Sequence, residues 1–128
     1  MNEKLVVLVE DNPKNMKLLR DVLSHAGYKV VEASNAEDGI ALAQDRTPNL
    51  ILMDVQLPGM DGLEAVKILK HDVRTATLPV IAVTAFAMKD DRERALDAGF
   101  DGYLEKPISV RALREEVQNF IGPGVTDG

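Results

Sequence analysis

The sequence predicts an α/β domain built on a parallel sheet that is wrapped by helices. Strand-like and helix-like segments alternate five times along the 128 residues, which is typical of repeated strand–helix units. Three of the strand-like segments are apolar runs, as expected for strands buried on both faces. The length suits one domain, and its core must be mainly aliphatic because aromatic residues make up only 4% of the chain.

The first unit consists of a strand and a well-marked helix. Leu5–Val9 is a continuous apolar run. Asn12 suits the N-cap of the following helix, and Pro13 suits its first position, where the missing N–H costs nothing. Gly27 ends this helix. Its apolar face is predicted at Met16, Leu19, Leu23 and Ala26.

The second and third units follow the same order. Residues 28–33 form a short strand, and Ser34-Asn35-Ala36-Glu37 has the form of a capping box that opens a helix through Asp45. Pro48 prevents this helix from continuing. Leu50–Met53 is the third strand, and a loop rich in turn residues, 57–62, leads into the next helix. That helix uses Leu63, Val66 and Leu69.

The fourth and fifth units complete the domain. Val80–Val83 is a strand, and the helix at Lys89–Ala98 has so few apolar residues that packing stabilises it little. Gly102–Glu105 is the last strand, and Ser109 caps the last helix. We expect one domain over residues 1–122 and a flexible tail over 123–128. The last helix is predicted to point Val110, Leu113, Val117 and Phe120 inward.

Composition excludes several classes of function. The formal charge is −6, with 21 acidic and 15 basic residues, which argues against nucleic-acid binding. Cysteine is absent, so disulfides, thiolate metal sites and cysteine nucleophiles are excluded. The N-terminus does not have the form of a signal peptide, and no apolar run approaches membrane-spanning length. We therefore expect a soluble, cytoplasmic protein.

Reactive residues follow the strands at their carboxyl ends. Glu10 and Asp11 follow the first strand, Asp54 the third, Thr84 the fourth and Lys106 the fifth. In a parallel sheet these ends lie along one edge, where α/β proteins generally place ligands. Three carboxylates, a hydroxyl and an ammonium group at one edge predict a metal-assisted phosphorylation site.

Asp54 is the predicted nucleophile, because a carboxylate can form an acyl-phosphate intermediate. Glu10 and Asp11 would repel it strongly unless a divalent cation lies between them. Oxygen ligands favour Mg²⁺ over a softer metal. Asp54 and Asp11 would bind the ion, Glu10 would hold coordinated water, and the backbone carbonyl of Gln56 could complete the protein ligands.

The remaining groups suit a transferred phosphoryl group. Lys106 can offset charge on one phosphoryl oxygen and the Thr84 hydroxyl can donate to another. The helix start at Asn12 adds the positive end of a helix dipole. His25 and His71 fall on helices away from the strand ends, so the phosphoryl donor must be external.

These residues resemble the receiver domain of two-component response regulators, over about residues 4–121. The motifs that carry the resemblance match at every catalytic position. Residues 84–89 and 106–109 look most like single-domain regulators of the DivK kind. The matching motifs are Val9-Glu10-Asp11-Asn12, the segment Met53–Gly62, Val83-Thr84-Ala85 and Lys106-Pro107.

The resemblance implies a flavodoxin-like fold, with a five-stranded parallel sheet in the order 2-1-3-4-5 and helices on both faces. It implies that Asp54 accepts a phosphoryl group from a phosphohistidine on a partner histidine kinase or histidine phosphotransfer protein. The chain would catalyse its own phosphorylation and slow dephosphorylation without being a classical turnover enzyme. A cis bond before Pro107 is also implied.

Switching in this family couples Thr84 to an aromatic residue of the fifth strand, here Tyr103. Phosphorylation draws the hydroxyl inward, and the ring follows into the vacated space. We hypothesise that a downstream protein binds the helix at Lys89–Ala98, the fifth strand and the last helix. Gln56 and Phe86 occupy positions that influence hydrolysis in this family, and bulky Phe86 would screen the acyl phosphate from water.

Three alternatives stay open at this point. A metal-dependent aspartyl phosphatase of the haloacid dehalogenase type would carry an Asp-x-Asp motif, but Gln56 stands at the second position and a cap domain is lacking. A flavin- or nucleotide-binding module would need a glycine-containing phosphate loop, whereas residues 10–14 are acidic and lack glycine. The chain could also be a receiver excised from a hybrid histidine kinase.

Overall fold

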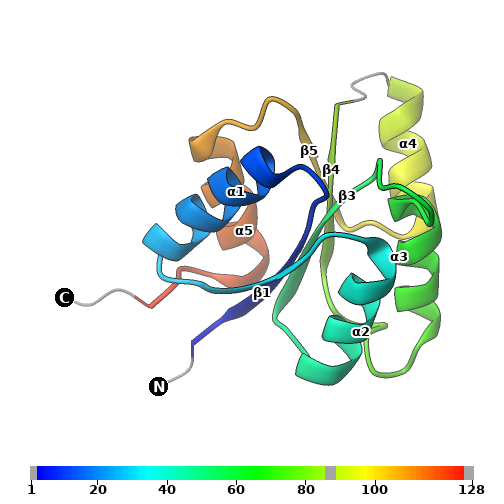
Figure 1. Ribbon diagram of the computed structural model, residues 1–128, viewed down its shortest axis with the longest axis horizontal. Coiled ribbons are helices and arrows are strands. Elements are labelled where there is room, and N and C mark those ends of the chain that lie inside the picture. The colour runs from blue at the N-terminus through cyan, green and yellow to red at the C-terminus, as the bar shows by residue number, and fades with distance from the viewer. Residues whose placement is uncertain (1–2, 86–88, 126–128) are drawn as a thin grey trace.

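The computed structural model describes residues 3–85 and 89–125, in which five strands and five helices alternate. Figure 1 shows the strands as one sheet between two layers of helices. The strands are β1 (Leu5–Val9), β2 (Lys29–Ala33), β3 (Leu50–Asp54), β4 (Val80–Thr84) and β5 (Gly102–Glu105). The helices are α1 (Pro13–His25), α2 (Ala36–Arg46), α3 (Gly62–His71), α4 (Lys89–Ala98) and α5 (Val110–Ile121).

The sheet is parallel throughout and has the order β2-β1-β3-β4-β5. This confirms the strand order and the fold class expected from the sequence. The register aligns Val9 with Met53 and Thr84 with Glu105. The residues at or just after the carboxyl ends of β1, β3, β4 and β5 therefore meet at one edge of the sheet.

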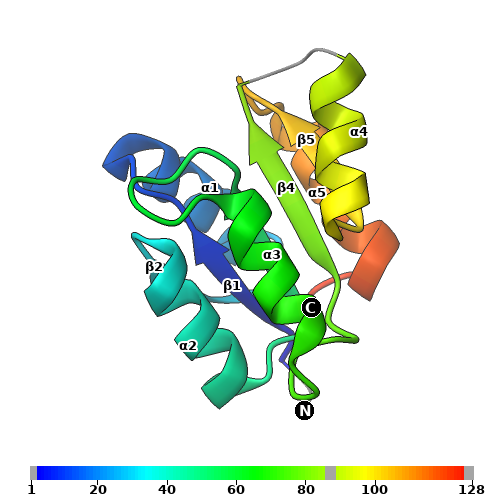
Figure 2. The ribbon, with the colours of Figure 1, turned by 90° about the vertical axis from the view of Figure 1, so that its right-hand side faces the viewer.

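Two apolar layers hold the helices to the sheet, because successive side chains of a strand point to opposite faces. Helices α1 and α5 cover one face, and α2, α3 and α4 cover the other (Figure 1). Figure 2 shows α2, α3 and α4 lying over their face of the sheet. The α1–α5 layer includes Val6, Leu8, Leu19, Leu23, Leu52, Ile81, Leu113 and Val117. The opposite layer includes Val7, Val9, Ile51, Met53, Ala65, Val66, Leu69 and Ala82.

The predicted cap of α1 is confirmed, whereas the cap of α2 differs by one residue. The Asn12 side chain accepts hydrogen bonds from the amides of Lys14 and Asn15. At α2 the cap is Asn35, whose side chain accepts from the Asp38 amide at 2.8 Å. The capping-box pattern that begins at Ser34 is therefore shifted by one residue.

The prediction that Val110 points inward was wrong, and the Phe120 ring contacts the sheet only at its edge strand. Their exposed fractions are 49% and 36%, while Leu113 and Val117 are buried. Val110 is the first residue of α5, and the Phe120 ring lies over Gly102 in the edge strand β5. Neither side chain is enclosed by the sheet on all sides.

Residues 122–125 pack against the turn between α1 and β2. The Tyr28 hydroxyl donates to the carbonyl of Gly122 at 2.5 Å, and the Val125 amide donates to the carbonyl of Gly27 at 3.1 Å. These contacts extend three residues beyond the domain end expected at residue 122. The flexible tail and the boundary at residue 122 stay predictions.

Within residues 3–85 and 89–125, none of the helices combines the length and the apolar character needed to cross a bilayer.

Candidate functional site

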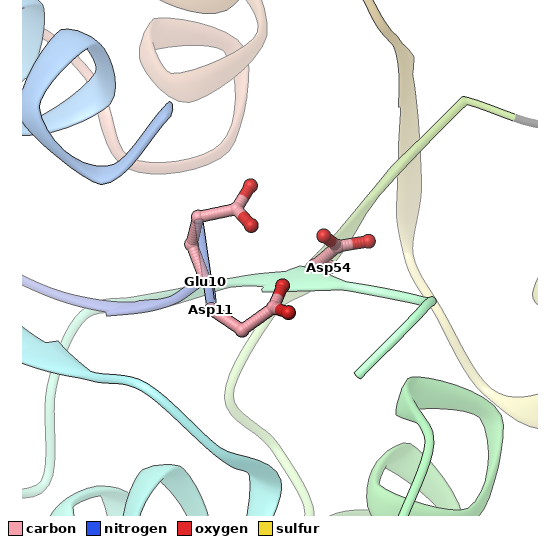
Figure 3. A group of neighbouring side chains, drawn as sticks. All are labelled: Glu10, Asp11 and Asp54. Carbon is pink, nitrogen blue, oxygen red and sulfur yellow. The ribbon is translucent and has the colours of Figure 1, made fainter. Parts of the chain in front are cut away.

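Three acidic side chains meet at the carboxyl edge of the sheet. Figure 3 shows Glu10 and Asp11 after β1 and Asp54 at the end of β3. One carboxylate oxygen from each of the three lies within 4.8 Å of the other two. Glu10 and Asp54 are only 2% and 3% exposed, whereas Asp11 is exposed. The predicted acidic cluster is therefore present, with two members inside the domain and one facing solvent.

Lys106 reaches this cluster from the residue after β5. Its Nζ donates to Asp54 Oδ2 at 2.8 Å and lies 3.0 Å from Glu10 Oε1. Burial alone would lower the pKa of Lys106, but its hydrogen bond to Asp54 and the nearby Glu10 carboxylate outweigh it and raise that pKa. The ammonium group therefore stays charged. The bond between Lys106 and Pro107 is cis, as the resemblance implies.

Backbone amides hold the two buried carboxylates in place. The Gln56 amide donates to Asp54 Oδ1 at 2.9 Å, and the Asn12 amide donates to Glu10 Oε2 at 3.1 Å. Burial raises the pKa of Glu10 and the nearby Asp54 charge adds to this, although the Asn12 amide and the Lys106 ammonium oppose it. Both carboxylates are thus oriented before any ligand binds.

The two amide donors were not predicted from the sequence. Every residue except proline carries such a donor, so residue type gives no signal for Asn12 or Gln56 in this role. A turn after each strand was the only available indication. A carboxylate at the end of a strand can accept from the amide two residues later when the chain turns there.

Thr84 lies at the end of β4, on the side of Asp54 away from Glu10. It is 2% exposed, and its carbonyl accepts from the Lys106 amide at 2.8 Å. Thr84 and Tyr103 both line a cavity of about 240 Å³ beside the acidic cluster. Its other lining residues are Val55, Gln56, Asp61, Leu63, Asp91 and Arg94. The two residues predicted to act as a switch therefore share one cavity, while Phe86 lies outside the described residues.

The histidines lie away from the cluster, as predicted. His25 ends α1 and His71 ends α3, at the ends of these helices that are remote from the carboxyl edge of the sheet. The His71 Nδ1 atom lies 2.7 Å from the carbonyl oxygen of Lys67 in its own helix. Neither histidine is placed to pass a phosphoryl group to Asp54 within the chain.

The acidic cluster has the chemistry of a site for a hard divalent cation. Carboxylate oxygens are the ligands that Mg²⁺ prefers. Glu10 Oε1 is buried and, among the residues that the structure describes, receives no hydrogen bond of good geometry, although Lys106 is close. Such an oxygen can accept a further hydrogen bond from metal-bound water without displacing a protein group. Glu10, Asp11 and Asp54 therefore fit the ion.

Comparison with protein-family models decides which of the expected families this is. The model for the response regulator receiver domain matches residues 6–118. The chain belongs to this family. Receiver domains accept phosphoryl groups in two-component signalling, taking them from histidine kinases or phosphotransfer proteins, and this chain has that function. The phosphatase and nucleotide-binding alternatives are not favoured.

Curated relatives and solved structures agree with this family. The receiver domain is 47% identical to the polar-differentiation response regulator DivK of Brucella anthropi over 119 residues, which cover 93% of this chain and 97% of the relative. The DivK protein of Brucella ovis is 46% identical with the same coverage. These similarities support a single-domain regulator resembling DivK.

Two solved structures show how closely the receiver fold is matched. A putative response regulator from Chloroflexus aurantiacus superposes with a TM-score of 0.90 at 29% identity, covering 94% of this chain and 98% of that one. The receiver domain of a sensor histidine kinase from Pseudomonas aeruginosa has a TM-score of 0.88 at 34% identity, covering 94% and 99%. That second structure holds a magnesium ion coordinated in its active-site cleft.

Proposed function

We propose that Asp54 is the phosphoacceptor of this receiver domain. The observation that carries the proposal is the Asp54 carboxylate itself: it is nearly buried at the carboxyl edge of the sheet, with Lys106 at 2.8 Å and two further carboxylates within 4.8 Å. An aspartate in this setting can attack phosphorus and form an acyl phosphate. Among the described carboxylates, only Asp54 and Glu10 have both a cation and an acidic pair beside them.

The transfer requires little covalent chemistry from the protein. An Asp54 oxygen forms the new bond to phosphorus as the bond from phosphorus to the donor histidine nitrogen breaks, and that nitrogen keeps the electron pair. Lys106 offsets charge on the transferred group, and the Thr84 hydroxyl donates to another of its oxygens. Positioning and electrostatic stabilisation therefore account for most of the catalysis.

We assign Mg²⁺ to Asp11, Asp54 and the carbonyl of Gln56, with Glu10 holding coordinated water. The bound ion would neutralise charge that develops on the phosphoryl oxygens. The cluster geometry and the magnesium ion in the related receiver from Pseudomonas aeruginosa support this assignment. The phosphoryl donor is a phosphohistidine of a histidine kinase or phosphotransfer protein. The cytoplasmic location of the protein stays a prediction.

Intact-mass measurement after incubation with acetyl phosphate and Mg²⁺ tests the acceptor. We expect one added phosphoryl group on the wild type and none on Asp54→Asn. Asp45→Asn is a matched control, because Asp45 lies near the end of α2 and outside the acidic cluster. Equal phosphorylation of wild type and Asp54→Asn would refute the assignment.

We also propose that α4, β5 and α5 form the surface that binds a downstream protein. Tyr103 links β5 to the cavity that Thr84 lines, so movement of its ring would reach this surface. Helix α4 contributes Ala95 as a buried residue, while Leu96 is 42% exposed. A helix with so few buried apolar contacts can shift at low cost.

Amide exchange with and without beryllium fluoride, a phosphoryl analogue, tests this surface. We expect altered exchange in α4 and β5 and unchanged exchange in α2. Unchanged exchange in α4, β5 and α5 under saturating analogue would contradict the proposal. The effect of Gln56 and Phe86 on hydrolysis stays a prediction, tested by the rate at which Phe86→Ala loses phosphate.

A further inference from the structure

Gly62 begins α3 directly behind the backbone of Asp54. A Cβ atom placed on Gly62 would lie 2.5 Å from the Asp54 carbonyl oxygen and 2.7 Å from the Val55 Cα. Both distances are shorter than any ordinary contact, and both partners are backbone atoms rather than the ends of flexible side chains. We infer that Gly62 is a positioning residue for the acceptor, because the helix can approach Asp54 this closely only without a side chain. This rests on the proposed role of Asp54.

A hydrogen bond fastens the helix to the same point. The Gly62 amide donates to the carbonyl of Val55 at 2.8 Å, and the Val55 amide donates to the carbonyl of Val83 at 2.9 Å. The loop between β3 and α3, which carries Gln56, is therefore closed by a hydrogen bond between Val55 and Gly62, next to the acceptor. The position of Gly62 sets how this loop leaves the strand.

Neither partner can move away easily if a side chain is added at Gly62. All five residues of β3 are buried, and α3 is held to the core by Ala65, Val66 and Leu69, each with an exposed fraction of 0%. Close-packed interiors transmit such strain rather than absorb it. The strain would therefore reach the Asp54–Val55 peptide and the Gln56 amide, which donates to Asp54 Oδ1.

The other glycine of this loop provides a contrast. Gly59 has a φ of +76° and no heavy atom within 4 Å of a Cβ placed on it. An alanine there strains its own backbone but pushes on no neighbour. Two glycines three residues apart thus have different roles, since Gly59 allows the turn and Gly62 allows contact with the acceptor.

Titration with Mg²⁺ followed by backbone NMR tests the inference without any phosphoryl donor. We expect Gly62→Ala to weaken Mg²⁺ binding about 10- to 100-fold, as for other groups that orient metal ligands. Gly59→Ala and Val117→Ala are the controls. Val117 is buried in α5, so its truncation destabilises the fold without touching the site. Both controls should bind Mg²⁺ within about twofold of the wild type.

A Mg²⁺ affinity of Gly62→Ala equal to that of the wild type would overturn the inference. An equal loss of Mg²⁺ affinity in Val117→Ala would also overturn it. If Gly62→Ala does not fold, the wild-type spectra decide: the Gly62 amide resonance should shift on Mg²⁺ binding together with that of Gln56, and an unshifted Gly62 resonance would count against the inference. The acceptor is judged separately. Absence of phosphorylation on wild-type Asp54 defeats the proposed function, whereas wild-type Mg²⁺ affinity in Gly62→Ala defeats only the positioning role.

Discussion

Lys106 is the residue on which the charge balance of the site depends. One ammonium group faces two nearly buried carboxylates, at 2.8 Å from Asp54 and 3.0 Å from Glu10. Asp11 adds a third negative charge at the same place. Like charges in a partly buried site oppose folding unless one is protonated or a cation binds. The stability of the receiver domain should therefore depend on both pH and Mg²⁺.

Glu10→Gln should raise the free energy of unfolding at pH 7 in the absence of Mg²⁺. Burial, with the Asp54 charge, raises the pKa of Glu10 above its ordinary value of 4.5, so its charged form is disfavoured in the folded state. Glu10 therefore favours folding most below pH 4.5, and this contribution is lost as the pH rises through the folded-state pKa. Urea denaturation of both proteins from pH 4 to pH 8 should show the variant gaining relative to the wild type as pH rises.

The same variant should respond less to Mg²⁺. A ligand at 100 times its dissociation constant stabilises the folded state by about 2.7 kcal/mol, and weaker binding in Glu10→Gln reduces this gain at a given Mg²⁺ concentration. Glu93→Gln is the control, because Glu93 is exposed on α4. It should match the wild type within about 0.5 kcal/mol. A stability difference between Glu10→Gln and wild type that does not change with pH would contradict the electrostatic explanation.

At the scale of elements, α1, α2, α3 and α5 each begin where a side chain accepts a hydrogen bond from a first-turn amide, and α2 shows how specific this is. The Asn35 side chain accepts from the Asp38 amide at 2.8 Å and donates to the Asp38 carboxylate at 3.0 Å. Asn35 and Asp38 thus occupy the two positions of a capping box, although Asp38 accepts from the Asn35 side chain rather than from its backbone amide. The same arrangement beginning at Ser34 would place the helix start one residue earlier.

Asn35→Ala should therefore lower the free energy of unfolding by about 1 kcal/mol. Ser34→Ala, one residue away, should change it by less than about 0.5 kcal/mol, because Ser34 does not cap α2. Urea denaturation of the two variants with the wild type gives both values. Equal losses in the two variants, or a larger loss in Ser34→Ala, would show that Ser34 contributes to the cap.

What could be predicted from the sequence follows from the range of the interactions involved. The strands, the parallel sheet and the meeting of Glu10, Asp54 and Lys106 depend on periodicity and on the shared edge of strand ends, which any chain of this pattern has. Ser34 and Asn35 are adjacent and both suit an N-cap, so the sequence alone does not show which of them caps α2. The contact of Gly62 with Asp54 depends on tertiary packing that no local pattern contains.

At the scale of the whole molecule, the segment after α5 contacts residues from the N-terminal part of the chain. The Lys4 ammonium donates to the carbonyl of Pro123 at 2.9 Å, and the Tyr28 hydroxyl donates to the carbonyl of Gly122 at 2.5 Å. A Cβ on Gly124 would lie 2.3 Å from the carbonyl oxygen of Ala26. The segment after α5 thus lies backbone against backbone on the turn between α1 and β2, at the end of α1 remote from Asp54.

Tyr28→Phe should weaken the packing of residues 122–125 against the turn between α1 and β2, without affecting the phosphorylation site. The ring is 4% exposed and stays buried in the variant, so only the hydrogen bond to Gly122 is lost, at a cost of about 1 kcal/mol. The Val125 amide, bonded to the carbonyl of Gly27, should exchange faster with solvent. Lys4→Met is the control, because its lost bond is exposed. Mg²⁺ affinity should match the wild type in both variants, since the acidic cluster lies at the opposite end of α1. Unchanged Val125 exchange in Tyr28→Phe would show that the segment docks without the hydroxyl, and a weakened Mg²⁺ site would show that the two ends of α1 are coupled.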